Sequence, residues 1–154
     1  MNYCLAMGDS KMYTVSYGLE ELWKLSAYPF LSGLVSYAEQ LQRPTQPCSG
    51  APKFIHYAAH AETLSQFFDG LGIHRLGRSF PSSAIIFEFL KVTTLNVVTP
   101  AVRMVFYDGE TQREDILRFP GQTQDVLSME VFARKIIDRL NLAGGSLVDI
   151  VKKC

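Results

Sequence analysis

Apolar residues along this chain occur in blocks that have either the spacing of a helix or the length of a strand. One block has the i, i+3, i+4, i+7 spacing of a helix with one buried side, and it consists of Leu64, Phe67, Phe68 and Leu71. Gly72 lies where that helix would end. Directly before it, residues 53–59 are an apolar run that we interpret as a strand buried on both faces, with His56 as a hydrogen-bonded core residue. The order is therefore strand, polar turn and helix, with His60 and Glu62 in the turn.

Further strands follow this helix. Ser83–Val92 is a strongly apolar run in which Glu88 is the first charged residue. We favour a structural role for this carboxylate over a place near a substrate, because buried charges need partners. Val102–Phe106 and Asp115–Phe119 are extended in pattern, and Asp108-Gly109 between them is typical of a hairpin turn.

The last predicted helix begins after Ser128, which can cap it, with Glu130 in its first turn. Its apolar stripe consists of Phe132, Ile136 and Leu140. Between the strands, residues 93–100 are interpreted as a β-rich or irregular link. Strands and helices in this order predict an α/β fold.

The N-terminal part has a helical pattern. We predict a short amphipathic helix over residues 17–27 and a second helix that begins at Pro29. The buried stripe of the second helix is expected to be Phe30, Leu34, Tyr37 or Ala38, and Leu41. The proline-rich and polar residues 43–52 then form a loop. Residues 1–154 are interpreted as one domain, with a helical lead-in over 1–43 and the α/β part over 53–140.

His60 and Glu62 are the residues most suited to chemistry. In an α/β sheet, ligands bind beyond the carboxyl ends of strands, and a helix start favours anions such as phosphate. A protonated histidine can bind phosphoryl oxygens, and a carboxylic acid can give a proton to a departing alcohol. The alternative is structural: Glu62 complements the helix dipole and His60 is a capping or half-buried polar residue. His74, Arg75 and Arg78 could approach a substrate or be solvated loop charges.

Several motifs in a consistent order resemble the histidine acid phosphatases. The run His60-Ala61-Glu62-Thr63-Leu64 resembles the second signature of that family, in the form found in multiple inositol polyphosphate phosphatases. Residues 81–90 (PSSAIIFEFL) resemble the family's next strand, and residues 102–110 (VRMVFYDGE) resemble the following hairpin. Phe119-Pro120-Gly121 and the helix-like residues 129–140 resemble its closing segment.

This resemblance implies a fold and an activity. The fold would be part of a three-layer αβα domain, with a mixed sheet of about four strands flanked by helices. The activity would be hydrolysis of phosphomonoesters through a phosphohistidine, without a metal or organic cofactor. His60 would bind the phosphoryl group, and Glu62 would be the proton donor. The ligand would be a phosphomonoester or inorganic phosphate, and inositol phosphates are suggested by association.

The family's nucleophile lies in an Arg-His-Gly-x-Arg-x-Pro signature, which is absent from this sequence. The histidines are His56, His60 and His74, and none follows an arginine or precedes a glycine. The chain therefore looks like the C-terminal part of a phosphatase, and we expect it to be inactive alone. The alternative is a non-catalytic fragment or pseudophosphatase that binds a phosphate ligand or a protein partner. An unrelated α/β binding protein is the third possibility.

Charge and composition exclude some partners and leave others open. Lysine plus arginine and aspartate plus glutamate number 15 each, so no overall field favours nucleic acid or an anionic membrane. No apolar run is long enough to cross a bilayer. Three widely spaced cysteines predict neither a disulfide framework nor a zinc site. No signal-peptide pattern is present, and the compartment stays open, since relatives are often secreted or lysosomal. An exposed edge at residues 53–59 would favour a homodimer.

Overall fold

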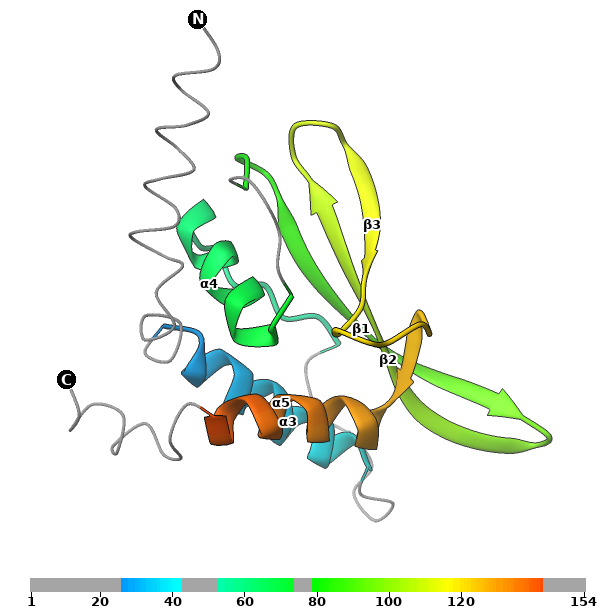
Figure 1. Cartoon of the computed structure of the whole chain (residues 1–154). Coiled ribbons are helices and arrows are strands. Elements are labelled where there is room, and N and C mark those ends of the chain that lie inside the picture. Colours follow the sequence, from blue (N-terminus) through cyan, green and yellow to red (C-terminus); the bar gives the residue numbers. More distant parts are fainter. Residues whose placement is uncertain (1–25, 43–52, 74–78, 143–154) are drawn as a thin grey trace, which may run out of the picture.

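The computed structural model describes residues 26–42, 53–73 and 79–142, which form an α/β fold (Figure 1). This confirms the predicted fold class. The helices in the described part of the chain are α3 (Tyr28–Gln42), α4 (Ala61–Leu71) and α5 (Met129–Leu142). The strands there are β1 (Ala84–Thr94), β2 (Val97–Asp108), β3 (Arg113–Leu117) and β4 (Val126–Ser128).

Strand β2 is the centre of the four-stranded sheet. It pairs with β1 along its whole length, from Thr94 opposite Val97 to Ala84 opposite Tyr107. On its other edge it pairs with β3 through residues 104–108, at its C-terminal end, and with β4 through residues 101–103, in its middle. All of these pairings between described strands are antiparallel. Because β2 has neighbours on both edges, it carries much of the buried sheet surface, including Val102, Met104 and Phe106.

The predicted strand over residues 83–92 is confirmed as β1, and of the two interpretations of residues 93–100, a β-rich or an irregular link, the β-rich one is confirmed. Strands β1 and β2 form one long hairpin that turns at Leu95 and Asn96. Both turn residues have positive φ angles, 49° and 63°, as in the two-residue turns whose twist matches that of paired strands. Asparagine tolerates this conformation, whereas leucine rarely adopts it. The first position of this turn therefore carries none of the residue types that predict a turn from sequence.

The hairpin predicted around Asp108-Gly109 is confirmed by β2 and β3. The Asp108 carboxylate accepts hydrogen bonds from the backbone N–H groups of Glu110 at 2.9 Å and Thr111 at 3.2 Å. Gly109 is needed for space, because a Cβ atom there would lie 2.0 Å from the carbonyl oxygen of Pro81. The turn is thus packed closely against the start of β1.

The ends of α4 and α5 follow the sequence signals. Helix α4 ends at Gly72, whose φ of 70° is left-handed and whose N–H donates to the carbonyl of Asp69. The next N–H, that of Ile73, donates to the carbonyl of Phe68, as in a Schellman motif. The predicted cap of α5 is also present, since the N–H of Val131 donates to Ser128 Oγ at 3.3 Å.

The predicted helix from Pro29 is confirmed as α3, but its buried stripe is displaced. The buried residues are Leu31, Val35 and Ala38, so Ala38 is confirmed as the buried alternative to Tyr37, whereas Phe30, Leu34 and Leu41 are only half-buried. The physical reason is that α3 packs its Leu31 side into the core formed with α5. Because residues 30 and 31 are both apolar, two overlapping helical stripes can be drawn, one from each residue. The sequence pattern does not distinguish which stripe is buried.

Residues 53–59 do not form the predicted central strand. They are extended but belong to no ladder of the described sheet, and Phe54 and Tyr57 are 82% and 66% exposed. His56 is exposed as well, so its predicted role as a core residue is wrong. The physical reason is the lack of a pairing neighbour among the described residues. The segment is instead anchored by Tyr57, whose ring meets the edge of Phe30 with centroids 5.4 Å apart.

A chain of touching aromatic rings links the elements of the fold. We call it the aromatic chain, and it runs through Tyr57, Phe30, Phe67, Phe87, Phe132 and Phe119, with neighbouring centroids between 5.4 and 6.4 Å apart. It passes in turn from the extended segment through α3, α4, β1 and α5 to the loop after β3. Phe68 makes a second bridge, from α4 to Phe106 of β2 at 5.4 Å. Helix α4 is thereby fixed to both α3 and the sheet.

Some predictions fall on residues outside the described ranges. They are most of the helix over 17–27, the loop at 43–52, His74, Arg75, Arg78, and the cysteines Cys4, Cys48 and Cys154. Among the described helices, none combines the length and the apolar character that a membrane crossing requires.

Candidate functional site

His60 and Glu62 lie at the N-terminus of α4, where the sequence predicted them. His60 is the N-cap residue, with an extended backbone at φ −83° and ψ 163°. Its carbonyl oxygen accepts the N–H of Thr63 at 3.0 Å, which closes the first turn. Its side chain makes no capping hydrogen bond, and the residue is exposed. The imidazole is therefore available to a ligand, and the capping role considered for it is not used.

Glu62 stands in the first turn of the same helix and is half-buried. The first N–H groups of a helix have no partner within the helix, and together with the helix dipole they attract anions. A phosphate at this end would meet these N–H groups and the His60 imidazole together.

The opposite end of α4 is clamped by α5. Arg139 extends from α5 and donates hydrogen bonds to two carbonyl oxygens, Gly70 at 3.1 Å and Asp69 at 2.6 Å. A cation at this end complements the negative pole of the helix dipole. Sequence reasoning missed this clamp, because the meeting of α4 and α5 in space is not visible in the sequence. The clamp engages the C-terminal end of α4, whereas His60 lies at its N-terminal end.

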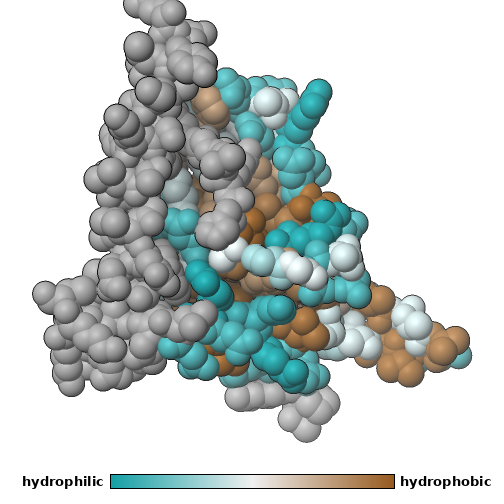
Figure 2. Space-filling model, viewed as in Figure 1, coloured by the Kyte–Doolittle hydropathy of each residue, from teal (hydrophilic) through white to brown (hydrophobic). Residues whose placement is uncertain are grey.

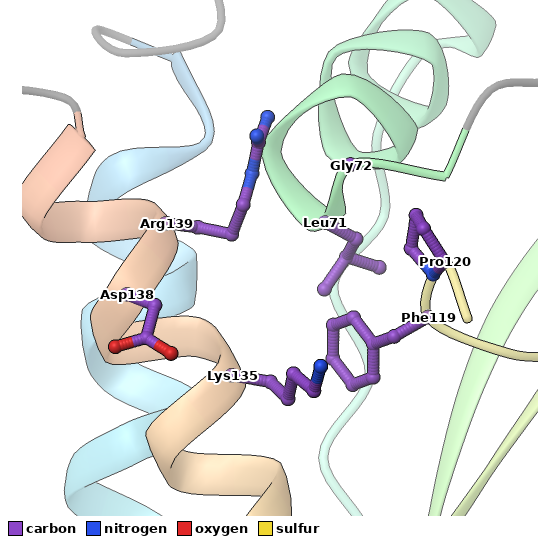
Figure 3. Close-up of a pocket in the computed structure, with 7 residues that line it drawn as sticks. All are labelled: Leu71, Gly72, Phe119, Pro120, Lys135, Asp138 and Arg139. Atoms are coloured by element: carbon purple, nitrogen blue, oxygen red, sulfur yellow. The ribbon is translucent and has the colours of Figure 1, made fainter. Parts of the chain in front are cut away.

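A hollow of about 340 Å³ lies beside the clamp, away from His60. It is lined by Leu71, Gly72, Phe119, Pro120, Lys135, Asp138 and Arg139 (Figure 3). Helix α4 separates it from His60 by about 16 Å, at 1.5 Å per helical residue. The negative pole of α4 faces this end, and the guanidinium of Arg139 is already engaged. The hollow is therefore a poor phosphate site compared with the N-terminal end.

Glu88 has the structural role that we favoured. It forms an ion pair with Arg103, which lies directly opposite on β2. The hydrogen bond from Arg103 holds the pKa of the Glu88 carboxyl below its usual value, against a smaller opposing effect of desolvation. This pair lies on the sheet face that points away from the core, whereas α4 packs on the core side through Phe68 and Phe106. Glu88 is thus not part of the His60 site.

Within the described ranges, no three His, Cys, Asp or Glu residues come close enough to hold a metal ion. The site at the start of α4 therefore consists of one imidazole, one carboxyl group and backbone N–H groups. His56, four residues earlier, lies in the exposed extended segment. The chemistry that these groups can perform is anion binding and proton transfer.

Comparison with known proteins gives little further information. No protein-family model matches the chain, and no solved structure is significantly similar to it. Among curated proteins, UvrABC system protein C of Haloarcula marismortui is 32% identical over 109 residues. The match covers 68% of this chain but only 18% of that protein. The chain thus spans less than a fifth of the length of this relative, and the match does not show a family.

The Glu88–Arg103 pair makes stability depend on pH. Because the pKa of Glu88 is lowered on folding, its contribution is present above the unfolded value of about 4.3 and is lost as pH falls through the folded value. We expect Arg103→Gln to destabilise the protein at neutral pH, and the difference from wild type to shrink at strongly acidic pH. Urea unfolding at both pH values measures this.

The control for this prediction is Arg134→Gln. Arg134 also pairs with a glutamate, Glu130, but both side chains are about two-thirds exposed, at 67% and 70%. Such surface pairs contribute little to stability. An equal effect of the two substitutions at both pH values would contradict the role assigned to Glu88.

Proposed function

We propose that this chain is the C-terminal part of a phosphomonoesterase of the histidine acid phosphatase type. The observation that supports this most is the exposed His60 imidazole at the extended N-cap of α4, with Glu62 in the first turn. The sequence around these two residues resembles the second signature of that family. The proposal therefore rests on a sequence motif and on its position at the start of a helix, where phosphate binding is favoured.

In this proposal His60 binds the phosphoryl group. As the phosphorus is attacked, negative charge on its equatorial oxygens is stabilised by a protonated imidazole and by the N–H groups at the start of α4. His60 is suited to this because its side chain is not used in capping the helix.

Glu62 is proposed as the proton donor. A histidine from outside this chain would attack phosphorus, forming a phosphorus–nitrogen bond as the bond from phosphorus to the alcohol oxygen breaks. The departing oxygen takes its proton from the Glu62 carboxyl group, so the alcohol leaves as a neutral molecule.

A second candidate function is phosphate binding without turnover. The observation that favours it is the lack of an Arg-His-Gly sequence around His56, His60 or His74. In this alternative the same helix start binds a phosphate-bearing ligand, and Glu62 takes part in no reaction. Both functions require phosphate at His60, and only the first requires a leaving group at Glu62. The similarity to UvrABC system protein C covers too little of that protein to support a third candidate.

Phosphate binding can be tested on the 154-residue chain by NMR. We expect the ring-proton resonances of His60 to shift as inorganic phosphate is added in the millimolar range, because the anion binds beside that ring. The resonances of residues near Arg139, where the hollow lies, should shift little. His60→Gln should abolish saturable binding.

The matched control is His56→Gln, since His56 is an exposed histidine of the same extended segment. Binding should persist in this variant. If phosphate shifts His56 and His60 equally and without saturation, the N-terminal site of α4 does not exist, and both candidate functions fail.

The role of Glu62 can be tested in a protein that also supplies the nucleophile. We expect Glu62→Gln to slow hydrolysis of alkyl phosphates by about 10²-fold to 10⁴-fold, the usual contribution of general acid catalysis. Aryl phosphates with acidic leaving groups should be affected much less, because their leaving oxygen needs no proton. Glu39→Gln, on the exposed side of α3, is the control. Equal losses for both substrate types would rule out proton donation by Glu62.

A further inference from the structure

Residues 53–60 are extended, and we call this segment the open strand. All of its residues are exposed, and it leads directly into α4 (Figure 1). Among the described residues, no backbone hydrogen bond involves residues 54–59. In an extended chain, the N–H and C=O groups of successive residues point to alternate edges. Both edges of the open strand therefore present backbone donors and acceptors.

The projecting end of the β1–β2 hairpin is a different kind of surface. It carries exposed apolar side chains, including Leu95 at 93%, and Figure 2 shows hydrophobic surface along it. Its two strands pair with each other up to the turn, so half of their backbone groups are used within the hairpin. Residues 92–102 contain no charged side chain that could select a partner. The open strand, by contrast, combines unused backbone groups with charge.

The side chains of the open strand form two sets, because they alternate along an extended chain. Tyr57 belongs to the set that faces the fold, since its ring contacts a ring of α3. Phe54 and His56 belong to the other set, and their ring centroids lie 6.4 Å apart. By the same alternation, Ala58 and His60 share this second set. A ligand that follows the second set therefore arrives at His60.

The open strand is basic. Its ionisable nitrogen-bearing side chains are Lys53, His56 and His60, and it contains no aspartate or glutamate. A second copy of the open strand is a poor partner, because antiparallel pairing centred on the segment places Lys53 of each copy opposite His60 of the other. Like charges directly opposite each other destabilise a strand pair. An acidic strand has the complementary charge.

We propose that the open strand binds an extended phosphopeptide by backbone pairing, with the phosphate of the peptide at His60. This rests on the phosphate site proposed above, which both candidate functions share. In complexes of this kind, main-chain hydrogen bonds supply affinity, and alternate side chains supply sequence preference. The peptide occupies one edge of the open strand. The other edge stays available to the element that supplies a nucleophile.

The spacing of the second set predicts the sequence preference of the peptide. An extended chain advances about 3.3 Å per residue, so His56 lies about 13 Å from His60. A carboxylate four positions from the phosphorylated residue therefore lies opposite His56. Ala58 is small, so it leaves room for a bulky side chain between these two positions.

The test is a titration of the purified 154-residue chain with a fluorescently labelled peptide, followed by anisotropy at mildly acidic pH. The peptide has phosphothreonine at its centre, glutamate four positions away on each side, and valine and threonine between them. It therefore suits either chain direction. We expect it to bind at least about tenfold more tightly than inorganic phosphate, and by a similar factor more tightly than the unphosphorylated peptide.

The matched variants are Ala58→Pro and Ala59→Pro. Each removes one backbone N–H, and the two N–H groups belong to opposite edges of the open strand. Neither makes a backbone hydrogen bond in the described fold, so both variants should fold, which circular dichroism checks. One variant should weaken peptide binding at least about tenfold, and the other should change it little. In both, inorganic phosphate should still shift the His60 resonances.

Equal effects of the two proline variants would overturn the proposal, as would a phosphopeptide that binds no more tightly than inorganic phosphate. If inorganic phosphate still shifts His60 in either case, the phosphate site stands and only peptide binding fails. If it does not, the phosphate site fails as well. A dimer in sedimentation velocity that a proline variant abolishes would overturn the proposal in favour of a second copy of the open strand.

Discussion

The contact on which the rest of the structure depends is the packing of Phe67 between Phe30 and Phe87. It joins α4 to α3 on one side and to β1 on the other, with ring centroids 5.4 and 6.4 Å apart. Such ring pairs each contribute about 0.5–1.5 kcal/mol beyond the burial of their apolar area. Together with Phe68 on Phe106 they fix the axis of α4. The position of His60 follows from that axis, because the residue is the N-cap of this helix.

The two ends of α4 have opposite electrostatic roles. Arg139 binds the carbonyl groups at the C-terminal end, so the negative pole is neutralised within the fold. The N-terminal end retains its N–H groups together with an exposed imidazole and a half-buried carboxyl group. A helix that is anchored by its aromatic side and by its C-terminus holds the residues at its other end in a fixed position, and there we propose the anion site. The hollow of about 340 Å³ belongs to the clamped end and marks no such site.

Local signals in the sequence were sufficient for most of the fold. Gly72 ends α4, Ser128 caps α5 and Asp108-Gly109 forms a hairpin turn. Each of these residue types suits the backbone conformation or hydrogen bonding needed at its position. The turn at Leu95 and the clamp by Arg139 were missed. The turn uses leucine, a residue that disfavours positive φ. The clamp depends on contact between two helices that are far apart in the sequence. The order of His60 and Glu62 at a helix start was predictable, whereas the ligand that they meet was not.

The error at residues 53–59 arises because apolar content was taken as a sign of burial in a sheet. This segment has the apolar content of a buried strand, and periodicity alone cannot say which surface covers it. The structure leaves Phe54 at 82% exposure and Val97 at 63%. The hydrophobic pattern indicates that a segment needs burial. Which surface buries the segment is determined by the three-dimensional arrangement of the neighbouring elements.

The central claim is that the N-terminal end of α4 is an oxyanion site. The most direct test is a crystal of the chain soaked in tungstate, a tetrahedral oxyanion with a strong anomalous signal. The account predicts a tungstate peak within hydrogen-bond distance of the His60 ring and the first N–H groups of α4. A peak at Lys135 and Arg139 instead, or none near His60, would contradict it.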